Sequence, residues 1–195
     1  MRFQTTDQHT DRATDQPTGG LVVVSGNPRP GSRTLALAEE VGRRVADELG
    51  LTATDPVDLA LLAPEILTGS TAVAAARHRV ATARVVVVAT PVYKASYTGL
   101  LKAFLDGYGP DALADVVVVP VVVSASPAHA LAGEVHLRPV LVELGAVVPA
   151  RTFAVSEGQL ADVGPLLEAW LERWAATLGR AVPAPLPHGG APLSG

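Results

Sequence analysis

Apolar runs alternate with amphipathic segments along most of the chain. Four runs are apolar at nearly every position, as in parallel strands that are covered on both faces. These strands are predicted over residues 21–25, 84–90, 115–124 and 147–155. A weaker pattern over 54–59 places Val57 and Leu59 on one face of a further strand. The chain is therefore expected to form five strands.

Helical patterns separate these strands. The predicted helices cover 34–49, 69–83, 99–108, 128–144 and 159–178. In the first helix, apolar residues recur at the spacing of one helix face: Leu35, Ala38, Val41, Val45 and Leu49. Thr71 is a candidate cap of the second helix, and Gly145 is expected to end the fourth in the left-handed conformation.

Strands that alternate with helices predict an α/β sandwich around a parallel sheet. Five strands without a duplicated half favour the flavodoxin-like strand order 2-1-3-4-5 over the six-stranded dinucleotide-binding order. In that order the first and third strands are neighbours. Their following loops, 25–34 and 90–99, should therefore face one another across a crevice at the carboxyl edge, where such folds bind ligands.

The loop after the first strand has the composition of an anion site. It joins a buried strand to a helix start, where backbone N–H groups attract negative charge. Its candidate binding residues are Ser25, Asn27, Arg29, Ser32, Arg33 and Thr34. A helix capped by Ser32 or Thr34 is the structural alternative. The loop lacks the lysine of a nucleotide-hydrolysing loop and the G-x-G-x-x-G fingerprint, which leaves a phosphomonoester as the predicted ligand.

All three tyrosines and both lysines of the chain lie within residues 93–108. This segment follows the third predicted strand, so its polar and aromatic side chains should stand at the carboxyl edge of the sheet. The candidate binding residues are Pro91, Val92, Tyr93, Lys94 and Ser96. The loop after the fourth strand adds Ser124, Ala125 and Ser126.

Composition narrows the classes of function. The chain has 195 residues, a formal charge of −4 and no cysteine. It has no basic stripe for nucleic acid and no apolar run long enough for a membrane span. The missing cysteines exclude thiolate catalysis and fit a cytoplasmic location. Polar or Pro-rich segments at 1–20 and 181–195 are expected to be disordered tails around one domain at 21–180.

Three motifs resemble those of the NAD(P)H-dependent FMN reductases, particularly the branch that supplies reduced flavin to two-component monooxygenases. The first motif is Gly26-Asn27-Pro28-Arg29-Pro30-Gly31-Ser32-Arg33-Thr34. The second, Pro91-Val92-Tyr93-Lys94-Ala95-Ser96-Tyr97-Thr98-Gly99-Leu100-Leu101-Lys102, is long and specific. The third comprises 126–131 and 137–141. The resemblance covers about residues 21–156.

This resemblance implies that the 25–34 loop binds the FMN phosphate and the 91–99 loop follows the flavin ring. NADPH or NADH would supply the hydride, and neither a catalytic side chain nor a metal is implied. It also implies a homo-oligomer and a monooxygenase that receives reduced FMN. The chain has Asn27 where the family usually has Ser, Ser124-Ala125 in place of two glycines, and Glu134-Val135 in place of an Asp-Tyr pair.

Two other functions remain open from the sequence. One is a flavoprotein that holds FMN tightly and reduces quinones, azo or nitro compounds, or metal oxyanions. The other is a non-enzymatic flavodoxin-like protein that only binds FMN.

Overall fold

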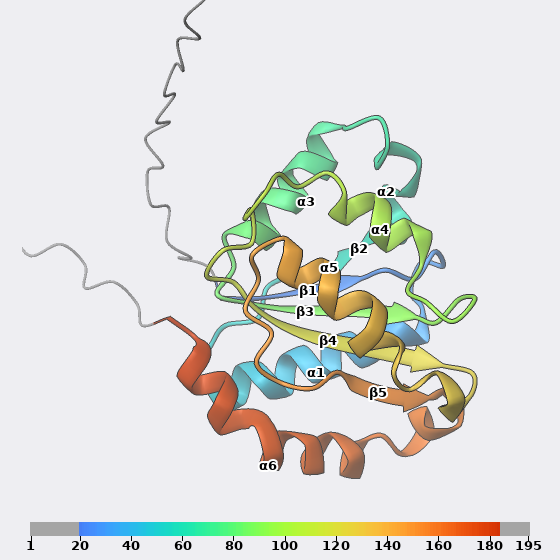
Figure 1. Ribbon diagram of the computed structural model, residues 1–195, viewed down its shortest axis with the longest axis vertical. Coiled ribbons are helices and arrows are strands. Elements are labelled where there is room, and N and C mark those ends of the chain that lie inside the picture. The colour runs from blue at the N-terminus through green and yellow to red at the C-terminus, as the bar shows by residue number, and fades with distance from the viewer. Residues whose placement is uncertain (1–19, 184–195) are drawn as a thin grey trace, which may run out of the picture.

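The protein has a single five-stranded parallel sheet of order β2-β1-β3-β4-β5 (Figure 1), described here from a computed structural model that covers residues 20–183. The strands are β1 (Leu21–Ser25), β2 (Val57–Asp58), β3 (Val85–Pro91), β4 (Val117–Ser124) and β5 (Phe153–Ser156). The flavodoxin-like strand order predicted from the sequence is confirmed.

Helices cover both faces of the sheet, because the strand residues are apolar on both sides. Their bounds are α1 (Arg33–Leu49), α2 (Leu59–Leu62), α3 (Thr71–Ala81), α4 (Gly99–Leu105), α5 (Arg138–Glu143) and α6 (Gly164–Ala181). Four short turns complete the set: η1 (Ala63–Glu65), η2 (Pro127–His129), η3 (Gly133–Leu137) and η4 (Glu157–Asp162).

Alternate residues of β1, β3 and β4 enter two separate cores. Val23, Val87 and Val119 pack on the face covered by α1 and α6. Val24 and Val88 pack on the opposite face with residues of α3, α4 and α5. The sheet is thus buried on both faces, and its loops at the carboxyl edge remain available for function.

Three predicted elements differ from those observed. The strand expected over 54–59 is reduced to Val57–Asp58, since Leu59 already begins α2. The strand expected over 147–155 begins only at Phe153, although Val147 makes one isolated bridge to Val117. The cap of α3 is Ser70 rather than Thr71, and its side chain accepts a hydrogen bond from Val73 N.

The helix predicted over 128–144 is the largest error. This segment is a 3-10 turn, a π-helical turn and the short helix α5, in which Pro139 occupies the first turn. Residues 132–143 are nevertheless continuously helical, because the π-helical turn directly precedes α5. Gly145 does follow the last turn with a φ of 87°, as predicted.

The C-terminal helix is also divided. The segment predicted as a helix over 159–178 contains the end of η4 and most of α6, which begins at Gly164 with Pro165 in its first turn. Helix α6 ends at Ala181, and Ala181 and Val182 pack against the core, although the predicted tail began at 181. Gly20 O and Pro183 O both accept hydrogen bonds from Arg84. The other residues of the predicted tails, 1–19 and 184–195, lie outside those that the structure describes.

Candidate functional site

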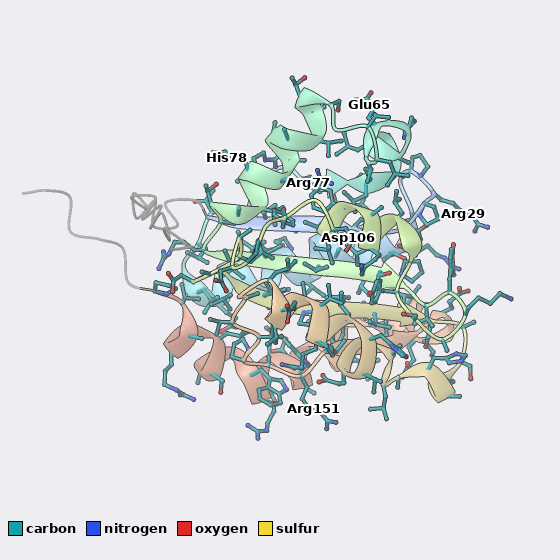
Figure 2. All side chains as sticks on the ribbon, turned by 45° about the horizontal axis from the view of Figure 1, so that its top comes forward. Arg29, Glu65, Arg77, His78, Asp106 and Arg151 are labelled. Carbon is teal, nitrogen blue, oxygen red and sulfur yellow. The ribbon has the colours of Figure 1, made fainter. Side chains whose placement is uncertain are left out.

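Three loops meet the carboxyl edge of the sheet, after β1, β3 and β4. The arrowheads of β3, β4 and β5 in Figure 1 point to this edge, and Arg29 extends from the same end in Figure 2. β1 and β3 are direct neighbours, paired from Leu21↔Val85 to Ser25↔Ala89. The loop over 26–32 and the loop over 92–98 therefore start side by side, as the strand order predicted.

The loop after β1 is held by its own side chains. Asn27 Oδ1 accepts a hydrogen bond from Arg29 N at 3.0 Å, and Asn27 Nδ2 donates to Thr34 Oγ1 at 3.0 Å. Ser32 caps α1, because its Oγ accepts from Leu35 N at 3.2 Å. Asn27, Ser32 and Thr34 therefore order this loop, which was the structural alternative considered for Ser32.

The same loop presents unused backbone donors. Within residues 20–183, no acceptor is present for the N–H groups of Asn27, Ser32, Arg33 and Thr34. The last three belong to the start of α1, a helix of 17 residues. Free N–H groups at a helix N-terminus favour an anion by direct hydrogen bonding and through the helix dipole.

Ser25 lies beneath this loop at the end of β1. Its side chain is fully buried, and its Oγ has no hydrogen-bond partner among the described residues. An unpaired buried hydroxyl is costly, so such groups need a particular explanation. A ligand group or water at the loop would supply the missing partner.

The two arginines of this loop have different environments. Arg33 Nη2 lies 2.8 Å from Glu157 Oε2 and links the start of α1 to η4. Arg29 is exposed, and its guanidinium forms no hydrogen bond or ion pair with any described residue. Arg29 is therefore the cation of this loop that is ready to meet an anionic ligand.

The loop after β3 contains a tight turn in an unusual conformation. Tyr93 N donates to Ser96 O at 2.8 Å, and Ser96 N donates back to Tyr93 O at 3.1 Å. The two residues between them, Lys94 and Ala95, have φ values of 53° and 66°. Side chains in this left-handed region cost energy, and such strain is concentrated at ligand-binding and catalytic sites.

Two further residues fix the base of this loop. Val92 N donates to Val123 O at 2.8 Å, and Pro91 is the last residue of β3. The exposed side chains of Tyr93 and Lys94 consequently stand on a short turn that is anchored to β4.

Thr98 connects the two loops; the sequence places it in the second motif but not among the candidate binding residues. Its Oγ1 donates to Gly26 O at 2.6 Å and accepts from Leu101 N at 3.2 Å, so it also caps α4. Thr98 N donates to Thr90 Oγ1 at 3.2 Å. A Cβ atom at Gly26 would lie 2.8 Å from Leu101 Cβ, which explains the glycine at this close approach.

Asp58 holds the first loop from the other side. Its Oδ2 accepts from Gly31 N at 3.2 Å, and its Oδ1 accepts from Ala60 N at 3.2 Å. Asp58 lies at the end of β2 and is 8% exposed. Its only sequence signal was a polar residue at the end of a weak strand pattern.

The loop after β4 brings the last predicted residues to the same edge. Ser124 is buried and donates through Oγ to Ser126 O at 2.8 Å. Ser126 Oγ in turn accepts from Ala128 N at 3.3 Å and caps η2. Ala125 is exposed between them. Both serine hydroxyls thus shape the loop.

Glu134, at a position where the chain departs from the family motif, has a structural role. Its carboxylate accepts from Arg138 Nε at 2.7 Å and from Thr152 N at 2.6 Å. Partial burial alone would raise the pKa of Glu134, but these hydrogen bonds outweigh burial and lower it. The hydrogen bond from Thr152 N to Glu134 ties the π-helical turn to the start of β5.

The donors at the carboxyl edge fit a phosphomonoester. Among the described residues, the loop after β1 has four backbone N–H groups without an acceptor and an exposed, unpaired guanidinium at Arg29. The strained turn at Lys94 and Ala95 stands on the neighbouring loop. These features suit FMN, which presents one phosphate and one flavin ring.

Comparison with known proteins agrees with this chemistry. The sequence model of the family "NADPH-dependent FMN reductase" matches residues 20–159. The chain belongs to this family. Its resemblance to FMN reductases and its flavodoxin-like fold are therefore established.

Similar proteins match nearly the whole chain. A protein of Pseudomonas putida named NADH-dependent FMN reductase SfnE is 35% identical, over 84% of this chain and 90% of its own length. The apo crystal structure of the NADH:FMN oxidoreductase EMOB is 32% identical, with a TM-score of 0.77 over 87% of this chain and 92% of that one. An oxidoreductase of Corynebacterium diphtheriae is 28% identical, with a TM-score of 0.74 over 86% and 98%.

Proposed function

We propose that this FMN reductase family member transfers a hydride from NADPH or NADH to FMN, with FMN bound at the loops after β1, β3 and β4. The observation that carries the proposal is the cluster of free N–H groups at the start of α1, beside the unpaired Arg29. This cluster belongs to a chain whose family reduces FMN.

Each loop would have a separate task. The N–H groups of Asn27, Ser32, Arg33 and Thr34, together with Arg29, would hold the phosphate. The turn that carries Lys94 and Ala95 would lie along the ring and direct backbone groups toward it. The Ser124–Ser126 loop would close the third side.

Bound FMN would supply the redox chemistry, since its N5 atom accepts the hydride that leaves nicotinamide C4. The protein contributes binding and orientation, so no side chain is required as an acid or base at this step. Arg29 and the loop N–H groups would set the position of the flavin. The nicotinamide would bind beside the exposed side chain of Tyr93.

We further propose that FMN exchanges as a substrate and that a flavin-dependent monooxygenase receives the reduced form. Side chains at Ser124 and Ala125 stand where family members have glycines, which would loosen the approach of backbone to the ring. Either NADPH or NADH would be the hydride donor, since the family is named for NADPH and the similar Pseudomonas putida protein is named for NADH.

A homo-oligomer is also part of this proposal. Leu131, Val135 and Val142 are more than half exposed on the segment that contains η3 and α5. Between α4 and α5 lies a groove of about 360 Å³, lined by Leu105, Tyr108, Val140 and Leu144 together with the charged Lys102, Asp106 and Glu143. The exposed apolar side chains of this segment favour contact with a second copy. Light scattering at micromolar concentration should give a dimer or larger, and a monomer mass would reject this part.

The function is tested by a steady-state assay with the purified protein. NADPH or NADH oxidation, followed at 340 nm, should require added FMN and saturate with its concentration. Absence of FMN-dependent oxidation with both nucleotides, together with no FMN binding in titration, would reject the proposal. Among residues 20–183, no helix is long and apolar enough to cross a membrane.

A further inference from the structure

We propose that Asp58 is a positioning residue that orients the phosphate-binding N–H groups. It thereby determines how strongly the protein prefers FMN over riboflavin. This inference rests on the proposed function. It adds to that function a residue on a different strand, which makes no contact of its own with the phosphate.

The Asp58 carboxylate holds two separate segments of backbone. Asp58 uses its two oxygens for two different backbone donors, Gly31 N and Ala60 N, each at 3.2 Å. It is nearly buried, and no Lys, Arg or His side chain among the described residues pairs with it. Its negative charge is therefore satisfied by backbone N–H groups, one in the phosphate loop and one in α2.

The hydrogen bond from Gly31 to Asp58 matters because of the backbone conformation of Gly31. Gly31 has a φ of 60°, and a Cβ atom there would meet nothing within 4 Å. The loop at this point is open and is held by no packing contact on that side. The hydrogen bond to Asp58 is the restraint that acts on Gly31 itself, in addition to the bonds that Asn27 and Ser32 make on either side of it.

The residues directly after Gly31 are those with free N–H groups. Ser32, Arg33 and Thr34 lie at the start of α1, and their N–H groups have no acceptor within residues 20–183. The direction in which the Ser32 N–H points depends on the backbone angles of Gly31. By fixing Gly31, Asp58 orients the first of these donors before any ligand arrives, and preorganised donors bind more tightly.

The chemistry of this position favours Asp over Asn. A carboxylate can accept from both backbone donors at once, whereas an amide has one oxygen and a donor NH₂ group. Asp58→Asn should therefore keep one of the two bonds and place a donor against the other N–H. Asp58→Ala should lose both. FMN binding should therefore weaken more in Asp58→Ala than in Asp58→Asn, because more hydrogen bonds are lost.

The experiment compares FMN with riboflavin, which has the same ring and lacks the phosphate. Flavin fluorescence titrations would be made on the parent, Asp58→Asn, Asp58→Ala and the control Asp55→Asn. Asp55 is an exposed carboxylate three positions earlier on the chain. Melting temperatures without flavin would show whether each variant is folded.

We expect the Kd for FMN to rise roughly threefold in Asp58→Asn and about tenfold in Asp58→Ala, the range of one or two lost hydrogen bonds. The Kd for riboflavin should change less than about twofold, and Asp55→Asn should match the parent. If the ratio of the two Kd values is unchanged in both Asp58 variants, whether both values rise equally or neither rises, the inference is overturned.

A second variant keeps the test decisive if Asp58→Ala does not fold. Gly31→Ala strains the other end of the same hydrogen bond without a steric clash. It should also weaken FMN more than riboflavin, and equal weakening would count against the inference. A parent protein that binds neither flavin would instead reject the proposed function, so the two failures are distinguishable.

Discussion

Thr98 Oγ1 lies 2.6 Å from the carbonyl oxygen of Gly26, 72 residues earlier in the chain. The bond joins the loop after β1 to the loop after β3. Because Thr98 also caps α4, one buried side chain sets the relative position of a helix and the two loops. This bond should define the distance between the phosphate site and the ring site of the proposed flavin pocket.

Replacing Thr98 by Val should therefore affect both stability and flavin binding. Valine has a similar shape but can neither donate to Gly26 O nor accept from Leu101 N. We expect a loss of about 1–3 kcal/mol in the free energy of unfolding, since a cap and a buried hydrogen bond are removed. Urea unfolding and FMN titration would measure the two effects.

Serine provides the matched control for this change. Thr98→Ser retains the hydroxyl and should restore FMN affinity close to that of the parent, with a small loss of stability from the missing methyl group. If Thr98→Val bound FMN as tightly as Thr98→Ser, the bond to Gly26 would have no role in the pocket.

Arg29 gives the most selective prediction for the phosphate. Removing its guanidinium in Arg29→Ala should weaken FMN by roughly 1.5–3 kcal/mol, the scale of a charge-assisted hydrogen bond. Riboflavin should bind equally to the variant and the parent. Arg151→Ala, which removes an exposed arginine at a distance from Arg29 in Figure 2, should leave both affinities unchanged. Equal FMN affinity for all three proteins would show that Arg29 does not contact the phosphate.

The turn at Lys94 and Ala95 is expected to be strained. Since glycine adopts a φ of 66° without steric cost, Ala95→Gly should raise the free energy of unfolding by about 0.5–1 kcal/mol. Ala125→Gly is the control, because Ala125 is exposed and is not among the residues with positive φ, so glycine there should not stabilise. Thermal melts would compare them, and a destabilised Ala95→Gly would contradict the account of strain.

Glu134 should make stability depend on pH in acid. Its pKa is lowered in the folded protein, so its contribution is complete above the usual value of 4.5 and is lost as pH falls through the lower folded value. Glu134→Gln should thus cost about 1–2 kcal/mol at pH 7 and progressively less below pH 4.5. Glu143→Gln, an exposed change on α5, should show no such trend. A difference between Glu134→Gln and the parent that is constant with pH would reject this role.

The strands of this protein were predictable because their signal is local. Runs such as Val85–Ala89 are apolar at every position, which is the pattern of a strand buried on both faces. The segment at 128–144 has apolar positions at helical spacing, but the helix covers only 132–143 and contains a π-helical turn at Gly133–Leu137. A Cβ atom at Gly133 would clash with Thr152 Cγ2, and such a close approach leaves no pattern in either segment.

The candidate site shows the same division. The loop after β1 and the 91–102 motif were found from composition and resemblance. Asp58 and the role of Thr98 within that motif were missed, because their decisive bonds reach Gly31 and Gly26, at separations of 27 and 72 residues. Likewise, the pairing of Arg33 with Glu157 depends on a contact over 124 residues, and it leaves Arg29 as the unpaired arginine of the loop. Tertiary structure therefore decides which of several similar residues is available to a ligand.

The most direct test of the account is the dependence of nicotinamide oxidation on free FMN. The protein should purify mostly colourless, and its rate should rise and saturate as FMN is added to NADPH or NADH. A yellow protein whose rate ignores added FMN and instead follows an added quinone or azo dye would contradict FMN as an exchanging substrate.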